Sequence, residues 1–554
     1  MGSEMQGLRA RRPGWLAWTL LAAAWFATVP LRPLLDPDEG RYAEIPREML
    51  TSGDWITPRF DGLKYFEKPP LQYWATAAVY AVAGVSEWSS RLWSAGLAFA
   101  CLALVFAWTG RLYGLEAGLA SLTALAVSPY FGIVGHLNLL DPGFTFWLSC
   151  AVFAFTLAQT SAVKSASERR WMLLAWGAAA LAVLSKGIVV GVLAGTALVV
   201  YTLIERDTLT WRRLHPLPGL ALFVLLAAPW FILVSLRNRG FPAFFFVHEH
   251  FTRFLTTVHQ RVEPWWYFLP LLLLGALPWA LPLARACRAA WSAGAPAAGH
   301  DVATGETSGF KPLKFLALYA GVTLVFFSAS GSKLAPYILP MFPVLAAITG
   351  VFVADHLRFT RRAARIVGAL VVFLAVGLLI YSAQRNSFVP HQAIAWAAVA
   401  VITSCFGVVV TFSAPRLTLA TRVLVSAAGA ILAWQSLLSE FTAIAPARSA
   451  RDLVAAVRPY ISAGTPLYSV GQYRETISPY LGRTLQLVAF EGELQFGLSE
   501  EPRARMSLEE FSARWSAGGA AVAFFDPGVW DSSRRRGLPG RVLAADNYTV
   551  AVSR

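Results

Sequence analysis

The chain has 554 residues, of which 56% are hydrophobic and only 14% are charged. Soluble domains carry about 25% charged residues, so this composition excludes an ordinary soluble protein and indicates a polytopic membrane protein. The formal net charge of +15 is compatible with nucleic-acid binding, but the basic residues lie between hydrophobic segments. Positive-inside topology explains them more simply, and we expect no nucleic-acid partner.

Hydrophobic segments follow one another along the first 440 residues. A membrane span needs about 20 apolar residues, and this requirement predicts about thirteen transmembrane helices. Arginines precede the first apolar run without a small-residue cleavage site, so we expect an uncleaved first helix. The predicted spans are 14–34, 90–112, 115–134, 143–160, 170–185, 187–204, 216–236, 264–284, 314–329, 337–355, 365–382, 392–412 and 420–440.

The basic residues also predict sidedness. If the N-terminus is cytoplasmic, the loops on that side carry the arginine and lysine clusters, as the positive-inside rule requires. The outer side then receives the tail and the loops that carry every polar motif considered below. These outer segments are 35–89, 135–142, the turn at Lys186, 237–263, 330–336 and 383–391.

Two regions outside the spans have their own predicted structure. The first outer loop predicts amphipathic helices at 38–50 and 71–85, which would lie along the membrane interface. The composition changes from 443 onward, so we expect a membrane domain at 1–442 and a small α/β domain at 443–554. The predicted elements of that second domain are a helix at 451–461 and strands at 466–470, 485–490, 520–525 and 548–552.

Three carboxylates follow the first hydrophobic helix within four residues, namely Asp36, Asp38 and Glu39. Charge at or near bilayer depth must be solvated, paired or bound to a metal. The cluster is compatible with chemistry at the membrane surface, and equally with a solvated loop that also caps a short helix.

A second motif in the same loop runs from Tyr65 through Glu67 and Lys68 to two prolines. The prolines predict a rigid extended turn. Lys68 could meet an anionic phosphate and Glu67 a cation or metal. The alternative is a local ion pair between the two, which would contribute about 0–1 kcal/mol.

Further polar residues lie at the predicted outer ends of other spans. Asp141 sits just before a span, where capping and the helix dipole would already account for a carboxylate. The segment from Ser330 through Lys333 to Tyr337 puts small residues and a lysine next to a helix N-terminus, which suits an anion. Lys186 is a weaker candidate of the same kind. Snorkelling is the alternative for both lysines.

A histidine-rich stretch lies in the fourth outer segment. His248, Glu249 and His250 are followed by Arg253 and His259. Imidazole together with carboxylate suits zinc, and a metal needs three or four ligands. Glu67 could supply one of them from another loop. The alternative is a polar interfacial helix.

Residues 36–44, 67–70 and 333–340 together resemble the motifs of the lipid-to-lipid glycosyltransferases of the GT-C superfamily. The closest resemblance is to the bacterial aminoarabinose transferases that modify lipid A. The protein O-mannosyltransferases are more distant relatives that share the acidic first-loop motif. The resemblance covers the membrane region through the order and spacing of its motifs.

The resemblance implies a multi-pass enzyme of the bacterial inner membrane whose active site and C-terminal domain face the periplasm. It would transfer 4-amino-4-deoxy-L-arabinose from undecaprenyl phosphate to a lipid A phosphate and so confer polymyxin resistance. No nucleotide cofactor is implied, and we expect a monomer. By residue, the family pattern implies catalytic roles for Asp38, Asp141 and Lys68. It implies a divalent metal, zinc above all, near Glu67, His248 and His250.

The chemistry of two anionic lipids agrees with this interpretation. A lipid A phosphate is already ionised, so the difficulty lies in desolvating two anions and holding them together rather than in removing a proton. Lys68, Arg41, Arg253 and Lys333 would neutralise the donor phosphate. Asp38 would position the acceptor or bind the sugar's ammonium group, or act as a base if the acceptor is a hydroxyl. We expect a single displacement with inversion. The predicted substrate-binding set is completed by Tyr42, Tyr65 and Tyr337.

Two other functions remain open from the sequence. One is protein O-mannosyltransfer, although the tail has no obvious lectin-like repeat. The other is a transporter or flippase, but transporters often show internal repeats and ionisable groups deep within their spans. Here the unusual charges gather at one face, and a long structured outer loop favours an enzyme.

Overall fold

The computed structural model describes residues 14–252, 263–277, 279–295, 309–354, 358–385, 390–413, 418–445 and 448–554. The chain divides into two compact units. The first contains Met1–Pro30, Ser94–Leu233 and Ala243–Ile444. The second contains Leu31–Trp93, Val234–Pro242 and Ala445–Arg554. The first outer loop therefore groups with the tail by its contacts, whereas the predicted division at 443 follows chain order.

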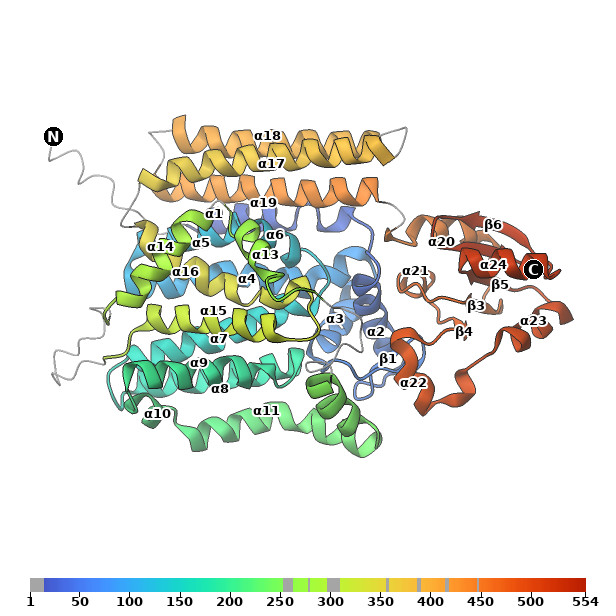
Figure 1. The fold of residues 1–554 in the computed structure, drawn as a ribbon, viewed down its shortest axis with the longest axis horizontal. Helices are drawn as coiled ribbons and strands as arrows, with labels where there is room; N and C mark the ends of the chain where they lie inside the picture. The colour runs from blue at the N-terminus through green and yellow to red at the C-terminus, as the bar shows by residue number, and fades with distance from the viewer. Residues whose placement is uncertain are drawn as a thin grey trace. The chain divides into compact units, whose positions relative to one another are not determined.

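The first unit is built from helices (Figure 1), among which α17, α18 and α19 run alongside one another. Its elements are α1 (Trp15–Phe26), most of α4 (Glu87–Tyr113), α5 (Leu115–Ala126), α6 (Pro129–Gly135), α7 (Leu140–Thr160), α8 (Ala166–Lys186), α9 (Val189–Glu205), α10 (Leu209–Arg212), most of α11 (Pro216–Arg237), the π-helix η3 (Ala243–Thr252), α13 (Phe268–Gly275), α14 (Ala280–Ser292), α15 (Pro312–Ala329), η5 (Ala335–Ile338), α16 (Met341–Ala354), α17 (Arg358–Arg385), α18 (His391–Ser413) and α19 (Leu419–Ile444). The short 3-10 helix η2 (Val29–Leu31) lies where the two units join in sequence.

Within the described ranges, five helices are long and apolar enough to cross a membrane. They are α4, α7, α11, α15 and α19. Further apolar helices, such as α9 and α16, are shorter. The multi-pass helical fold is therefore confirmed, and the number of thirteen spans stays a prediction.

Two predicted spans are interrupted rather than straight. The span at 115–134 becomes α5 and α6, which meet at a bend of 67°. Ser128 caps α6 by accepting a hydrogen bond from the Phe131 N–H, and Pro129 occupies the first turn, where its missing N–H costs nothing. The span at 264–284 becomes α13 and α14, separated by a turn after Gly275.

The predicted spans at 170–185 and 187–204 are separate helices with a break at Lys186. α8 ends at Lys186, and Gly187 follows with a φ of 91°, a backbone conformation that favours glycine. α9 then begins at Val189. Residues 166–205 are therefore a helix pair, and Lys186 lies at the turn between its members.

The part of the second unit that precedes the tail contains the two predicted amphipathic helices. They are α2 (Asp38–Ser52) and α3 (Leu71–Ala83), joined through a small hairpin of β1 (Arg59–Phe60) and β2 (Leu63–Lys64). Both helices end at glycines with positive φ, Gly53 and Gly84. α2 packs against α3, where the rings of Tyr42 and Tyr73 stack at a centroid distance of 6.3 Å.

The tail folds as an α/β domain around a five-stranded sheet of order β4-β3-β5-β7-β6. β3 pairs in parallel with β4 and β5, whereas β7 pairs antiparallel with β5 and β6. All four residues of β5 are buried, as expected of a central strand covered on both faces. The strands are β3 (Leu467–Val470), β4 (Gln486–Val488), β5 (Val522–Phe525), β6 (Arg541–Ala545) and β7 (Val550–Ser553).

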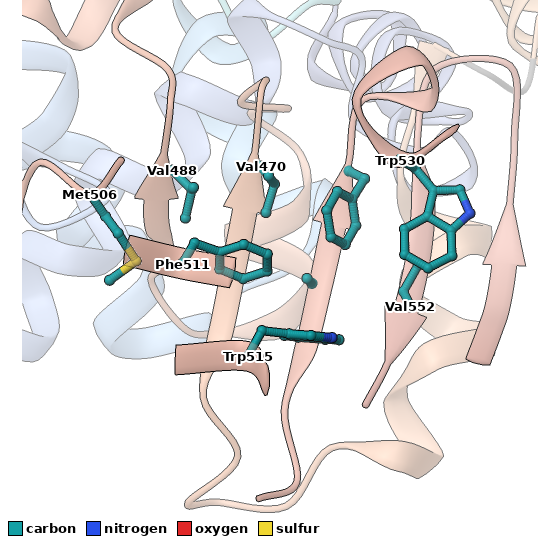
Figure 2. Packing of buried hydrophobic residues seen from close by; sticks show 9 residues of the cluster. Val470, Val488, Met506, Phe511, Trp515, Trp530 and Val552 are labelled. Carbon is teal, nitrogen blue, oxygen red and sulfur yellow. The ribbon is translucent and has the colours of Figure 1, made fainter. Parts of the chain in front are cut away.

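Short helices surround this sheet, and one face carries an aromatic core (Figure 2). Phe511 and Trp515 of one helix pack over the strands next to Val470, while Trp530 packs against Phe525 and lies close to Val552. The helices are α20 (Arg451–Val457), η7 (Arg458–Tyr460), α21 (Ile477–Leu481), η8 (Gly492–Leu494), α22 (Gln495–Glu500), η9 (Pro502–Ala504), α23 (Leu508–Ala517) and α24 (Pro527–Arg535). The small C-terminal α/β domain is confirmed.

Candidate functional site

The three carboxylates that follow α1 have three different environments, and Asp36 is a tether. Its Oδ2 pairs with the Arg474 guanidinium at 2.8 Å, and its Oδ1 accepts a hydrogen bond from the Thr476 N–H at 2.9 Å. Arg474 also pairs with Asp546 at 2.5 Å. Asp36 therefore fastens the first loop to the tail, which is a structural role.

Glu39 is locked in a buried pair with Arg91. Two guanidinium nitrogens reach the carboxylate at 2.7 and 2.8 Å, and the Arg91 side chain is completely buried. Arg91 also donates to the backbone carbonyls of Arg32 and Pro33. This fork-to-fork geometry satisfies both charges, so Glu39 holds the start of α2 in place.

Asp38 alone of the three remains accessible. Its side chain is 45% exposed and forms a 3.3 Å ion pair with Arg41, one turn later on α2. Its position in the first turn of α2 is favoured by the helix dipole. Asp38 is therefore the carboxylate of this cluster that a substrate can reach.

Arg41 lies at the centre of a cluster in the second unit, called the nest below, that also contains Asp38, Tyr42, Tyr65 and Glu493. Its side chain is only 5% exposed and forms ion pairs with Asp38 and with Glu493 of η8. The rings of Tyr42 and Tyr65 lie 5.9 and 6.0 Å from the guanidinium carbon. A buried, always-charged guanidinium surrounded by aromatic faces can stabilise an anionic ligand.

Close packing of α2 against the tail shapes this nest. A Cβ added at Gly40 would lie 2.6 Å from the carbonyl carbon of Glu475, so only glycine permits this approach. Burial raises the pKa of the Glu475 carboxyl to about 8, although the nearby Arg41 opposes the shift. Near neutral pH, Glu475 therefore carries a proton that it can donate or lose.

Three hydroxyl groups nearby are buried without a hydrogen-bond partner among the described residues. They belong to Tyr65, Tyr73 and Thr76. Burial raises the pKa of Tyr65, although Arg41 opposes the shift, so the phenol stays neutral and can donate. Buried hydroxyls normally find a partner, so this group suits a polar ligand.

Glu67 and Lys68 continue the same loop. Glu67 is buried and Lys68 is half-buried, with the Lys68 ammonium donating to the Glu67 backbone carbonyl at 2.8 Å. Pro69 and Pro70 then lead directly into α3. This hydrogen bond holds the Lys68 ammonium close to the backbone of Glu67 within the same turn.

A second polar cluster lies in the first unit. Asp141 in the first turn of α7 and Lys186 at the end of α8 form a direct, largely buried ion pair. The Lys186 ammonium lies 5.5 Å from the Phe144 ring and 4.7 Å from the Tyr337 ring. Each charge sits at the helix end that the dipole favours, and the rings shield the lysine from solvent.

Lys333 and Tyr337 have different surroundings within this unit. The Lys333 ammonium is buried and donates to the Ser330 carbonyl at 2.7 Å. Tyr337 packs its ring against Phe327 as well as against Lys186. The structure thus places Tyr337 against the Asp141–Lys186 pair, whereas Lys333 forms a hydrogen bond within its own turn.

The predicted metal ligands are only partly described. His248 stacks on Phe244, and its Nδ1 lies 3.6 Å from the neighbouring Glu249 carboxylate. His250 belongs to the backbone of η3 while its side chain, like all of Arg253, lies outside the described residues. Among the side chains that are described, no three His, Cys, Asp or Glu residues gather closely enough to hold a metal ion.

Comparison with solved structures gives a match along almost the entire chain. The crystal structure of ArnT from Cupriavidus metallidurans bound to undecaprenyl phosphate is similar with a TM-score of 0.85 and 32% identity, covering 97% of both chains. The chain belongs to the aminoarabinose transferase family. The same protein in its apo state matches with a TM-score of 0.83.

Sequence comparisons agree with this family. Residues 453–554 match the model of the aminoarabinose transferase C-terminal domain, and residues 25–253 match that of dolichyl-phosphate-mannose-protein mannosyltransferase. Undecaprenyl phosphate-alpha-4-amino-4-deoxy-L-arabinose arabinosyl transferases of Pseudomonas aeruginosa (strain UCBPP-PA14) and Aeromonas hydrophila are both 35% identical, over 62% of this chain. The alignment spans 60% of the length of each of these two relatives.

Several residues of the two clusters were not singled out as site residues by the sequence. Glu475 and Glu493 lie in the tail, and no pattern there marks them as neighbours of Arg41. Tyr73 lies on an apolar helix where aromatic residues are common. Lys186 did give a signal, because a lysine inside a long apolar stretch is rare.

Proposed function

We propose that this chain transfers 4-amino-4-deoxy-L-arabinose from undecaprenyl phosphate to a phosphate group of lipid A. The observation that carries the proposal is the accessible Asp38 carboxylate beside the buried Arg41, in a chain that resembles an undecaprenyl-phosphate-bound ArnT over 97% of its length. The reaction class is therefore glycosyl transfer between two lipid phosphates, by a multi-pass membrane protein.

The transfer is one displacement at the anomeric carbon. An oxygen of the acceptor phosphate forms the new bond to that carbon, the bond to the donor phosphate oxygen breaks, and its electron pair leaves on undecaprenyl phosphate. Configuration inverts, and no proton must be removed from an ionised acceptor. Arg41 and Lys68 stabilise the negative charge on the leaving phosphate, and Asp38 orients the acceptor or the sugar's ammonium group.

The other residues predicted from the sequence are proposed as a further catalytic group or as substrate contacts. Asp141 is proposed as a second catalytic carboxylate, and its pairing with Lys186 supports a role in which the two orient one another. Tyr42, Tyr65 and Tyr337 are proposed as substrate contacts. Lys333 and Arg253 are proposed as phosphate contacts.

We propose further that the acidic loop and the tail face the periplasm. The charge distribution of the loops supports this orientation through the positive-inside rule. A single cysteine placed at an exposed tail position such as Ser516 tests it. Labelling by a membrane-impermeant maleimide in intact spheroplasts supports the orientation, and labelling only after lysis contradicts it.

Zinc binding by Glu67, His248 and His250 is a separate proposal, supported by the donor chemistry of imidazole and carboxylate. When bound, zinc would polarise phosphate oxygens or hold the loops in place. The transfer described above is derived without it.

A second candidate is protein O-mannosyltransfer, which the match of residues 25–253 to the mannosyltransferase family favours. That activity needs a hydroxyl acceptor and therefore a general base. The match of residues 453–554 to the aminoarabinose transferase C-terminal domain favours the first proposal instead.

Complementation tests the proposal in cells. A strain that lacks its own aminoarabinose transferase should regain polymyxin resistance, and a lipid A mass increase of one aminopentose, when it expresses this chain. Lys186→Met, which leaves Asp141 without its ammonium partner, should abolish both at normal expression. Resistance without any change in lipid A mass would contradict the proposal.

A further inference from the structure

A cavity with several charged side chains in its lining lies in the second unit, between α2, the start of α4 and helices of the tail. It has a volume of about 610 Å³, large enough for a headgroup rather than a single ion. Its polar lining includes Arg47, Ser86, Glu87, Arg451, Arg458 and Tyr480.

This cavity lies on a different face of α2 from the nest around Arg41. Arg47 follows Arg41 by six residues, which an α-helix places about 9 Å further along its axis and about 120° around it. Asp38, by contrast, is three residues from Arg41 and shares its face. The cavity is therefore a separate site.

The charge of the lining favours an anion. The lining contains three guanidinium groups and one carboxylate, that of Glu87, which accepts a hydrogen bond from the Tyr480 hydroxyl at 3.3 Å. Glu44 balances the charge of Arg47, so the positive charge available to a ligand is that of Arg451 and Arg458. Arg458 donates to the neutral backbone carbonyl of Tyr480 at 2.7 Å, so this bond leaves its charge uncompensated. Arginine forks match phosphate oxygens in geometry and charge.

The other two guanidinium groups differ in how firmly they are held. Arg47 is fixed by two hydrogen bonds to the buried Glu44 carboxylate and by one to the Gly482 carbonyl. Arg451 pairs with the adjacent Asp452 at 3.2 Å, but both side chains are exposed, so water screens this pair. Arg451 and Arg458 are both exposed and can contact a ligand, while Arg47 and Glu44 form the wall.

The rim of the cavity is apolar where a membrane-spanning helix begins. Val85 lines the cavity and is 45% exposed, and Val82 nearby is 91% exposed. Trp88, in the first turn of α4, is also exposed, and tryptophan favours the membrane interface. α4 is one of the helices long and apolar enough to span a membrane. An anion attached to hydrocarbon fits this combination better than a free one.

We propose that this cavity binds the phosphate-bearing headgroup of a membrane lipid. Two sources offer that chemistry, namely a phosphate of lipid A other than the reacting one and the headgroup of a bulk anionic phospholipid. The inference goes beyond the proposed transfer, because the cavity holds a lipid phosphate whether or not sugar is moved.

The test removes the two exposed guanidinium groups together in the full-length protein, as Arg451→Gln with Arg458→Gln. Both side chains are exposed, so folding should be unaffected. The matched control is Arg534→Gln with Arg541→Gln, which removes the same charge from exposed positions of the same domain outside the cavity lining. Dissociation constants are measured in detergent micelles for lipid A, dephosphorylated lipid A, phosphatidylglycerol and inorganic phosphate.

Loss of two charge-assisted contacts should weaken binding of a phosphate-bearing lipid by about tenfold or more in the double variant, and not in the control. If the dissociation constant rises tenfold for lipid A alone, the cavity binds the acceptor lipid. If it rises for phosphatidylglycerol too, the cavity binds membrane phospholipid. Unchanged dissociation constants for both lipids would overturn the inference, as would inorganic phosphate binding as tightly as the lipids. Because transfer is not the readout, failure of the proposed function leaves this test intact.

Discussion

Neutralising Glu39 should unfold the second unit more easily, whereas the same change at Asp38 should not. In Glu39→Gln the neutral amide cannot balance the charge of the completely buried Arg91 guanidinium, which also donates to the carbonyls of Arg32 and Pro33. Asp38→Asn removes a contact at 3.3 Å from a side chain that is 45% exposed. Arg41 keeps its ion pair with Glu493 in that variant.

The structure sets the expected magnitudes. Breaking a buried ion pair by removing one partner costs about 3–5 kcal/mol, and the two remaining carbonyl acceptors place Glu39→Gln near the lower end. The half-exposed Asp38 contact is screened by solvent and contributes about 0–1 kcal/mol. The effect on the rate of sugar transfer should be the reverse. Asp38→Asn should lower this rate by about 100-fold or more, because we propose that the carboxylate acts on the substrate.

Thermal unfolding of the purified protein in detergent, followed by tryptophan fluorescence, measures the first effect. Transfer assayed at a temperature where both variants are folded measures the second. Glu39→Gln should lower Tm and keep most of its activity, and Asp38→Asn should do the reverse. Equal losses of Tm in the two variants, or full activity in Asp38→Asn, would refute the assignment of a structural role to one carboxylate and a functional role to the other.

Three further predictions concern packing, pH and metal. Gly40→Ala should lower Tm and impair transfer, because its Cβ would meet tail backbone at 2.6 Å; an unchanged Tm would contradict the close approach. Burial raises the pKa of Asp61 to about 8 and of Glu48 to about 9, with Glu44 adding to both shifts and Arg47 opposing them. As pH rises from about 4 to about 8, the folded state keeps these protons while the unfolded state loses them, so the free energy of unfolding should fall across that window. In Asp61→Asn this fall should be shallower by about 1.4 kcal/mol per pH unit, as measured by denaturant titration at several pH values. Elemental analysis should find zinc in the wild type and less in the Glu67→Ala variant; equal content in both, or none in either, would contradict the metal proposal.

Local patterns were sufficient to predict the helices near the membrane and four of the five strands of the tail sheet, but not the tail helices α23 and α24. The predicted helices at 38–50 and 71–85 correspond to α2 and α3, because amphipathic runs end at glycines that can adopt positive φ. β6 was missed because its residues are largely exposed at the sheet edge, so no apolar alternation marks it. The bend between α5 and α6 was missed because its cause is one cap and one proline inside an apolar run.

Motif order singled out Asp38 and Arg41 as candidates but could not predict their partners. Glu493 lies more than 400 residues from Arg41 in sequence, and only packing of the tail on α2 brings the two together. The division of labour among Asp36, Asp38 and Glu39 was also invisible, since it depends on where Arg474 and Arg91 lie. Tertiary contacts, rather than the residue types themselves, decide which carboxylate stays accessible.

Reconstituted transfer tests the central claim most directly. The purified chain is mixed in detergent with undecaprenyl phosphate-aminoarabinose and lipid A, and the lipid A product is analysed by mass spectrometry. We predict a mass increase of one aminopentose, release of undecaprenyl phosphate, and loss of both in Asp38→Asn. Unmodified lipid A with a wild-type protein that is folded and binds the donor would contradict the assignment.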